Sequence, residues 1–176
     1  MKAIAVMTGG APVAPNIQIV DLPTPEPGPG EARIRTEAAG LNHLDLWVGQ
    51  GLPGIDRPWP RVTGCDGVGR VDAVGDGVDE AWIGRRVIMN AAVAGVESPH
   101  PDRQPAGEAF RLVGEHTPGA MAEAFIAPAT NILDLGEDVF QYGTKPLDLR
   151  RDLTEVRRRD QDRPMERSSP REESSD

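Results

Sequence analysis

Several features that would point to whole classes of function are missing from the sequence. Cys65 is the only cysteine among 176 residues, so the chain can form no internal disulfide. No apolar run approaches the roughly 18 residues of a membrane-spanning helix. The N-terminus also lacks the apolar core and cleavage site of a signal peptide. We therefore expect a cytoplasmic protein with no membrane partner.

Positive charge and aromatic side chains are also scarce. The chain holds 28 acidic and 19 Lys or Arg residues, its formal net charge is −9, and only 4% of its residues are aromatic. Nucleic-acid binding requires a basic face, and single strands are held largely by stacking on aromatic rings. We therefore expect no nucleic-acid partner.

Short alternating segments divided by glycine and proline fill most of the sequence. Between them, Asn42–Val48 has the spacing of a short helix, with Asn42 as its cap and Gly49 and Gly51 ending it. Many short strands with little helix predict a mainly β domain, a small barrel or a sandwich. Alternation of apolar and polar residues predicts strands at 2–7, 16–22, 31–39, 67–74, 86–89 and 120–127.

The C-terminal part of the chain has a different composition. From Asp148 onward it contains nine acidic residues and eight arginines, and few large apolar residues. Such a segment buries too little apolar surface to offset the entropy lost on ordering. We therefore predict a domain over residues 1–135 and an unrelated, disordered polar tail over 136–176. A transient helix presenting Leu149, Leu153 and Val156 on one face is the alternative for part of the tail.

Four segments, in this order, carry a resemblance to a known family: PTPEPGPGEARIRTEAAG, GLNHLDLWVGQGLP, VTGCDGVGRVDAVGDGV followed by IGRRVIM, and GEHTPGAMAEAFIAPATNIL. Together they resemble the medium-chain dehydrogenase/reductase superfamily, in the branch of zinc-type alcohol dehydrogenases and zinc-free quinone oxidoreductases. The resemblance implies a GroES-like, partly open β-barrel with short helices, which is the substrate-side catalytic domain of such enzymes. It also implies hydride transfer between NAD(P)H and a small carbonyl, alcohol or quinone.

The resemblance places candidate catalytic residues at the predicted helix. Asn42 stands where zinc-dependent relatives have a cysteine ligand, and an amide there can polarise a substrate carbonyl. A helix cap is the alternative role for Asn42. His43, which can relay a proton near neutral pH, and Asp45, which can orient a polar partner, complete the candidate catalytic set. Trp47, Cys65 and Asp66 are expected to line the substrate-side cleft.

No metal ligand is predicted. The Gly-His-Glu segment of zinc-dependent relatives reads Gly64-Cys65-Asp66 here, and their lobe of four cysteines has no cysteine in this chain. A catalytic zinc requires about three protein ligands in a tetrahedral arrangement. Cys65 is therefore interpreted as a small buried residue rather than a zinc ligand.

A dinucleotide-binding fingerprint is not found either. Gly67 and Gly69 lie in an alternating strand pattern that no helix follows, which indicates close strand crossings rather than a phosphate cradle. We therefore predict no cofactor-binding residue and no Rossmann domain. NAD(P)H is expected as the cofactor only because the family resemblance implies it.

This absence leads to an expectation about the whole chain. We expect a domain truncated before its nucleotide-binding half, by a frameshift, a gene-calling error or a genuinely short product. Such a chain would be inactive unless a separate nucleotide-binding partner completes it. Self-association is also expected, through apolar surface that the missing half would cover. A non-catalytic interaction or regulatory barrel derived from the family is one alternative, and an unrelated ligand-binding barrel is another.

Overall fold

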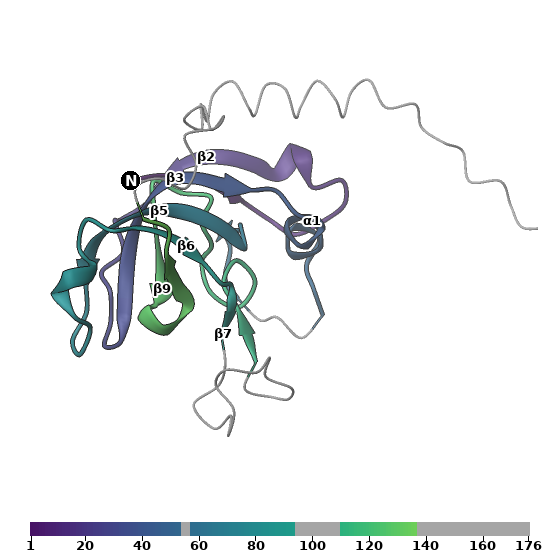
Figure 1. Ribbon diagram of the computed structural model, residues 1–176. Coiled ribbons are helices and arrows are strands. Elements are labelled where there is room, and N and C mark those ends of the chain that lie inside the picture. The colour runs from purple at the N-terminus through teal and green to yellow at the C-terminus, as the bar shows by residue number, and fades with distance from the viewer. Residues whose placement is uncertain (54–56, 94–109, 137–176) are drawn as a thin grey trace, which may run out of the picture.

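The computed structural model describes residues 1–53, 57–93 and 110–136. Within these residues β-strands dominate, and the one α-helix, α1, spans His43–Gln50 (Figure 1). None of the helices in the described ranges has the length and apolar character needed to cross a bilayer. The predicted polar tail lies outside the described residues from Glu137 onward.

The largest sheet has five strands in the order β10-β6-β5-β3-β9, and every neighbouring pair is antiparallel. Its centre is the pairing of β3 with β5, and both strands alternate as their sequences predict. In β3, Ala32 and Ile34 are fully buried, whereas Arg33 turns outward to pair with Asp72 at 2.8 Å. The strands are β3 (Glu31–Gly40), β5 (Asp66–Val74), β6 (Arg86–Met89), β9 (Ala124–Pro128) and β10 (Ile132–Asp134).

Two smaller sheets complete the β-structure. A three-stranded sheet has the order β2-β1-β4, and β7 pairs with β8. The sheets do not close into a continuous cylinder, which agrees with a partly open barrel. The predicted mainly β, GroES-like fold with short helices is confirmed. Their strands are β1 (Lys2–Val6), β2 (Ile17–Asp21), β4 (Arg61–Val62), β7 (Ala92–Val93) and β8 (Arg111–Leu112); the short 3-10 helices are η1 (Ala14–Asn16), η2 (Glu80–Trp82) and η3 (Ala129–Asn131).

One segment, 120–125, joins the two hydrophobic cores. Ala120 and Phe125 belong to the core of the five-stranded sheet, whereas Met121 and Ala122 belong to the core under β1. Backbone hydrogen bonds link the same segment to β1, including Ile4 N to Met121 O at 2.8 Å. The segment therefore ties the two sheets into one packed unit.

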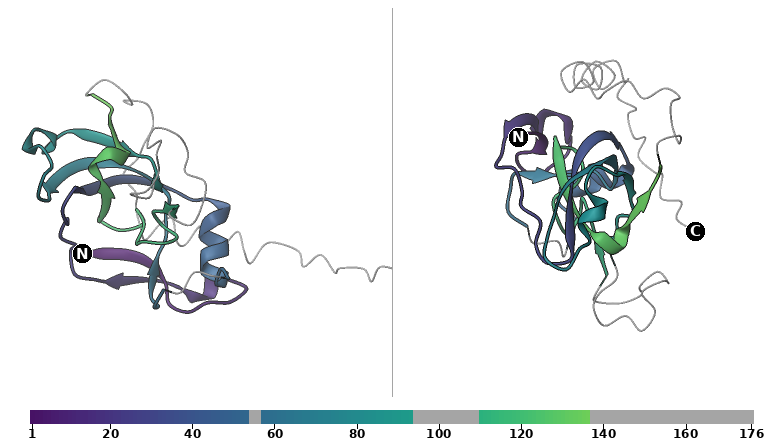
Figure 2. Two further views of the ribbon diagram at one scale, coloured as in Figure 1. Left: turned by 90° about the horizontal axis from the view of Figure 1, so that it is seen from below. Right: turned by 60° about the vertical axis from the view of Figure 1, so that its left-hand side comes forward.

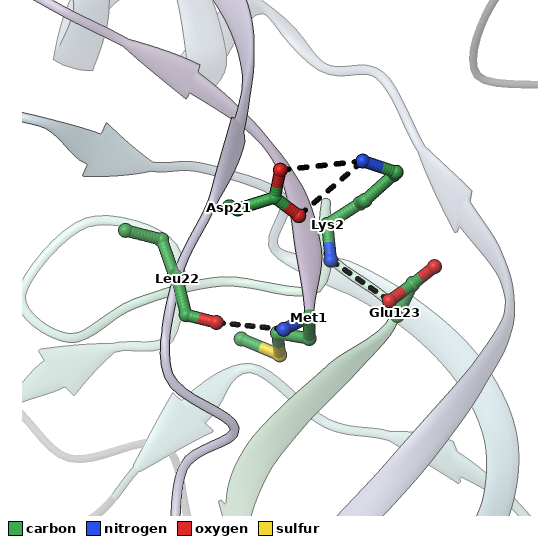
Figure 3. Close-up of polar contacts among 5 residues, drawn as sticks. All are labelled: Met1, Lys2, Asp21, Leu22 and Glu123. Carbon is green, nitrogen blue, oxygen red and sulfur yellow. Dashed lines mark hydrogen bonds and ion pairs between the residues drawn. The ribbon is translucent and has the colours of Figure 1, made fainter.

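Polar contacts support this junction at the start of β1. The Lys2 backbone N–H donates to Glu123 Oε2 at 2.8 Å, and the Lys2 ammonium lies 3.3 Å from the Asp21 carboxylate on β2 (Figure 3). The Met1 ammonium donates to the Leu22 carbonyl at 2.7 Å. These contacts hold β1 between β2 and the 120–125 segment.

The predicted strand at 120–127 begins four residues late, at Ala124. Its first part instead bonds the backbone before β5: Ala120 N donates to Gly64 O at 2.9 Å and Met121 N to Thr63 O at 3.0 Å. These contacts place the segment against the Gly64 turn. The Gly64 N–H donates to Asp45 of α1 at 2.8 Å, and α1 lies at one end of the sheets, after β3 (Figures 1 and 2).

Candidate functional site

The site is built where the start of α1 meets the turn before β5. Asn42 occupies the N-cap position, with the extended backbone (φ −127°, ψ 163°) that a cap requires. Asp45, in the first turn, accepts from the Asn42 backbone N–H through Oδ2 at 2.7 Å. Its other oxygen, Oδ1, accepts from the Gly64 N–H at 2.8 Å. One carboxylate, only 7% exposed, therefore fixes the helix start against the turn.

The side chain of Asn42 points across to that turn. Its Nδ2 donates to Asp66 Oδ2 at 2.7 Å and lies 3.3 Å from Cys65 Sγ. The bond to the carboxylate is charge-assisted and strong, whereas a thiol sulfur is a weak acceptor. Among the described residues, the Asn42 Nδ2 group therefore has one strong acceptor, Asp66, and one weak acceptor, Cys65.

Glycines allow this close approach. Gly64 has φ +103°, a conformation that L side chains rarely adopt, and an added Cβ would lie 2.9 Å from Met121 N. Gly40, which pairs with Asp66 across β3 and β5, would place a Cβ 3.1 Å from Asp66 Cβ. The turn that carries Cys65 and Asp66 can therefore lie tightly between α1 and the 120–125 segment.

The environment of Cys65 favours the protonated thiol. Partial burial raises its pKa first, and the negative charges of Asp66 and then Asp45 raise it further. The amide of Asn42 opposes this effect through its contact with the sulfur. At neutral pH the side chain is therefore a neutral S–H group, and its reactivity as a thiolate is low.

His43 and Trp47 lie apart from these four residues. Both are exposed on the outer face of α1, with ring centroids 6.4 Å apart and planes tilted by 42°. Among the described residues, no hydrogen bond or ion pair joins His43 to Asn42, Asp45 or Asp66. The structure thus brings together Asn42, Asp45, Cys65 and Asp66 from the predicted set, whereas His43 and Trp47 make no hydrogen bond to these four within the described residues.

Sequence reasoning missed other residues around the site. Leu41, Leu46 and Trp47, which precede α1 or lie on it, are 71%, 48% and 53% exposed. The sequence alone could not identify these residues, because only the structure shows that their apolar side chains are exposed. Behind the turn, Gly114 approaches Gly64 so closely that an added Cβ would lie 2.8 Å from its carbonyl.

A zinc ion does not fit the residues at this position. The Asn42 amide donates toward both Cys65 Sγ and Asp66 Oδ2, so N–H groups point at the atoms that would otherwise ligate a cation. Both oxygens of Asp45 already accept backbone N–H groups. Across residues 1–53, 57–93 and 110–136, no three His, Cys, Asp or Glu side chains group so as to hold a metal ion.

The glycines of β5 also do not form a phosphate cradle. An added Cβ on Gly69 would lie 2.0 Å from Arg35 O, and one on Gly67 would lie 2.6 Å from the Ala120 Cβ. Both glycines therefore serve close packing, as the sequence predicts. In the part of the chain that the structure describes, no Gly-rich turn opens a helix after a strand as a dinucleotide site requires.

Comparison with known protein families agrees with this fold. Residues 28–137 match the family described as the alcohol dehydrogenase GroES-like domain. Glucose 1-dehydrogenase 1 of Haloterrigena turkmenica is 37% identical over 157 residues, covering 81% of this chain and 40% of that protein. The starvation-sensing protein RspB of Escherichia coli is 32% identical over 125 residues, covering 70% of this chain and 37% of that protein.

Solved structures show the same likeness. A crystal structure of an NAD-dependent alcohol dehydrogenase superposes with a TM-score of 0.67 at 36% identity, covering 76% of this chain and 39% of that one. A structure of E. coli rspB complexed with NADH gives a TM-score of 0.67 at 27% identity, over 80% of this chain and 40% of that one. The chain spans about two fifths of the length of these relatives. It belongs to the alcohol dehydrogenase GroES-like domain family of the medium-chain dehydrogenase/reductase superfamily.

Proposed function

We propose that this chain provides the substrate-binding domain of an NAD(P)H-dependent oxidoreductase acting on a small carbonyl or quinone compound. The observation that carries the proposal is the Asn42 amide, which is anchored by Asp66 and has a second N–H that faces only a thiol sulfur. Relatives named as an alcohol dehydrogenase and as a quinone oxidoreductase support the reaction class.

The geometry suits a carbonyl-polarising role. A substrate oxygen is a better acceptor than the Cys65 sulfur, so it can replace that sulfur as partner of the second Asn42 N–H at little cost. Negative charge that develops on the oxygen then strengthens the bond. The Cys65 thiol, which stays protonated at neutral pH, lies close enough to the amide to act as a second, weak donor.

Other residues hold this arrangement in place. Asp45 fixes the Asn42 backbone to the turn, and Asp66 fixes the direction of the amide. The described residues do not form the nucleotide site, so in this proposal NAD(P)H is held by protein outside them. The nicotinamide, when bound, supplies the hydride; the residues of this domain orient the carbonyl to receive it.

Binding of a carbonyl compound tests the proposal. Titration of the full chain with benzoylformamide, a neutral aryl ketone, is followed by NMR of the Asn and Gln side-chain amides. We expect the Asn42 amide signal to shift, and Asn42→Ala to weaken binding about tenfold, the value of one hydrogen bond. Asn90→Ala, an exposed amide beyond β6, is the matched control and should bind as the unaltered chain does. Unchanged affinity in Asn42→Ala would contradict the proposal.

A non-catalytic binding module is the second candidate function. It is favoured by the large apolar side chains of Leu41, Leu46 and Trp47, which are exposed to solvent and can contact another protein. Titration of the chain with benzoylformamide separates the two. Binding that Asn42→Ala weakens supports the oxidoreductase domain, whereas no binding of the ketone favours the binding module.

A further inference from the structure

The charges closest to the Asn42 amide are both negative. Asp66 Oδ2 lies 2.7 Å from Asn42 Nδ2, and Asp45 Oδ2 lies 2.7 Å from the backbone nitrogen of the same residue. Neither carboxylate forms an ion pair with a Lys, Arg or His side chain within the described residues. In the described part of the chain, Asp66 is held by the hydrogen bond from the Asn42 amide.

The pKa of the Cys65 thiol responds to the same two carboxylates. The charged groups that act on it are Asp66 and Asp45, and both raise its pKa. No cation is among the causes of the shift. A ligand oxygen that replaces the sulfur beside Asn42 would enter this negative region.

The helix that begins at Asn42 exposes apolar rather than cationic side chains. Leu41, Leu46 and Trp47 present about half or more of their surface to solvent. Helix α1 contains no lysine or arginine, and His43 is its only basic residue. Helix α1 therefore offers no guanidinium or ammonium group to a ligand carboxylate.

Resting on the proposed function, we infer that the Asn42 site selects uncharged aryl or alkyl carbonyl compounds over those that carry a carboxylate next to the carbonyl. Asp66 is the residue that determines this selectivity. Two like charges a few ångströms apart repel strongly enough near a protein surface to weaken binding on the order of tenfold. The repulsion is screened by salt, so the preference falls as ionic strength rises.

A matched pair of ligands tests the inference in the full chain. Benzoylformamide and benzoylformate share the phenyl ring and the ketone and differ in a neutral amide against a carboxylate. Dissociation constants come from NMR titration at low and high salt. We expect the amide to bind about tenfold tighter at low salt, and Asp66→Asn to reduce that ratio toward one because it removes the charge. Asp72→Asn, which removes a charge on the same strand where Asp72 pairs with Arg33, should keep the ratio.

Each outcome decides between the possibilities. A ratio that collapses in Asp66→Asn and persists in Asp72→Asn supports the inference, since a loss of folding would weaken both ligands alike. Equal binding of the two ligands by the unaltered chain leaves the proposed function standing and overturns the inference. A preference that Asp66→Asn leaves intact also overturns it. If neither ligand shifts the Asn42 amide signal, both the proposed function and the inference fail.

Discussion

At the scale of single residues, the chemistry of the site depends on one proton. Cys65 holds it because burial and the charges of Asp66 and Asp45 disfavour the thiolate. The Asn42 amide favours the thiolate but is outweighed. A neutral thiol leaves the second amide N–H available to a better acceptor, which is the condition that the proposed function requires.

The alkylation rate of Cys65 measures this balance directly, because no other cysteine is present. We expect iodoacetamide to reach its half-maximal rate on the folded chain at a higher pH than on the urea-unfolded chain, where the ordinary value is about 8.5. Asp66→Asn should lower that pH only in part, since burial is the larger cause, and Asn42→Ala should raise it. Half-maximal rates at the same pH in folded and unfolded chains would contradict the prediction.

The same pKa shift has a consequence for stability. A thiol whose folded pKa lies above its unfolded pKa stabilises the fold fully below the unfolded value, and that contribution is lost as pH rises through the folded value. The loss therefore belongs to the alkaline range, above about pH 8.5.

Only part of the site could be predicted from the sequence. The family motif indicated Asn42, Asp45, Cys65 and Asp66, and the structure brings these four together. The direction of the Asn42 amide could not be predicted, because its partner Asp66 is 24 residues away and reaches it only through the tight turn at Gly64. The role of each residue in catalysis stays a prediction.

At the scale of secondary-structure elements, Asp45 joins a helix to a turn. A buried carboxylate that accepts two backbone N–H groups cannot be replaced by an amide without placing an NH₂ group against one of them. We expect Asp45→Asn to lower the free energy of unfolding by about 1–3 kcal/mol, measured by urea denaturation.

The same substitution at another cap provides the control. Asp79 caps the short helix η2 and accepts from Ala81 N at 2.9 Å at an exposed position. Asparagine caps helices about as well as aspartate, so Asp79→Asn should change stability by less than about 0.5 kcal/mol. Equal effects of the two substitutions would show that Asp45 acts as an ordinary surface cap and does not link α1 to the turn.

The bounds of most longer strands could be predicted from the sequence, whereas the shortest strands could not be predicted. Strand β6 has its predicted bounds, and β1, β2, β3 and β5 lie within one residue of theirs at each end. Strands β4, β7, β8 and β10 have two or three residues, too few for an alternating pattern to be recognised. Strands β4 and β10 form on longer neighbours, β1 and β6, whereas β7 and β8 pair with each other.

At the scale of the whole molecule, the two cores depend on each other. Residues 120–125 contribute to both, and Ala39 of β3 packs against both. Loss of packing in the larger core should displace Phe125 and Ala120, and with them Met121 and Ala122. We therefore expect the described domain to unfold in a single cooperative transition.

Tryptophan fluorescence can follow each core separately. Trp82 packs against the larger core, and Trp59 lies beside β4 with its ring 4.0 Å from the Arg61 guanidinium carbon. Chains that retain only one of these tryptophans, the others replaced by phenylalanine, should show coincident midpoints in urea. Val71→Ala, at a position only 1% exposed in the larger core, should lower the free energy of unfolding by about 2 kcal/mol. Both urea midpoints should then fall together.

A matched substitution shows whether the effect comes from core packing. Val78→Ala removes the same two methyl groups from a half-buried position in the turn after β5, and should cost less than about 1 kcal/mol. If Val71→Ala lowers the Trp82 midpoint and leaves that of Trp59 unchanged, the cores unfold independently. The segment 120–125 would then transmit no packing between the two cores.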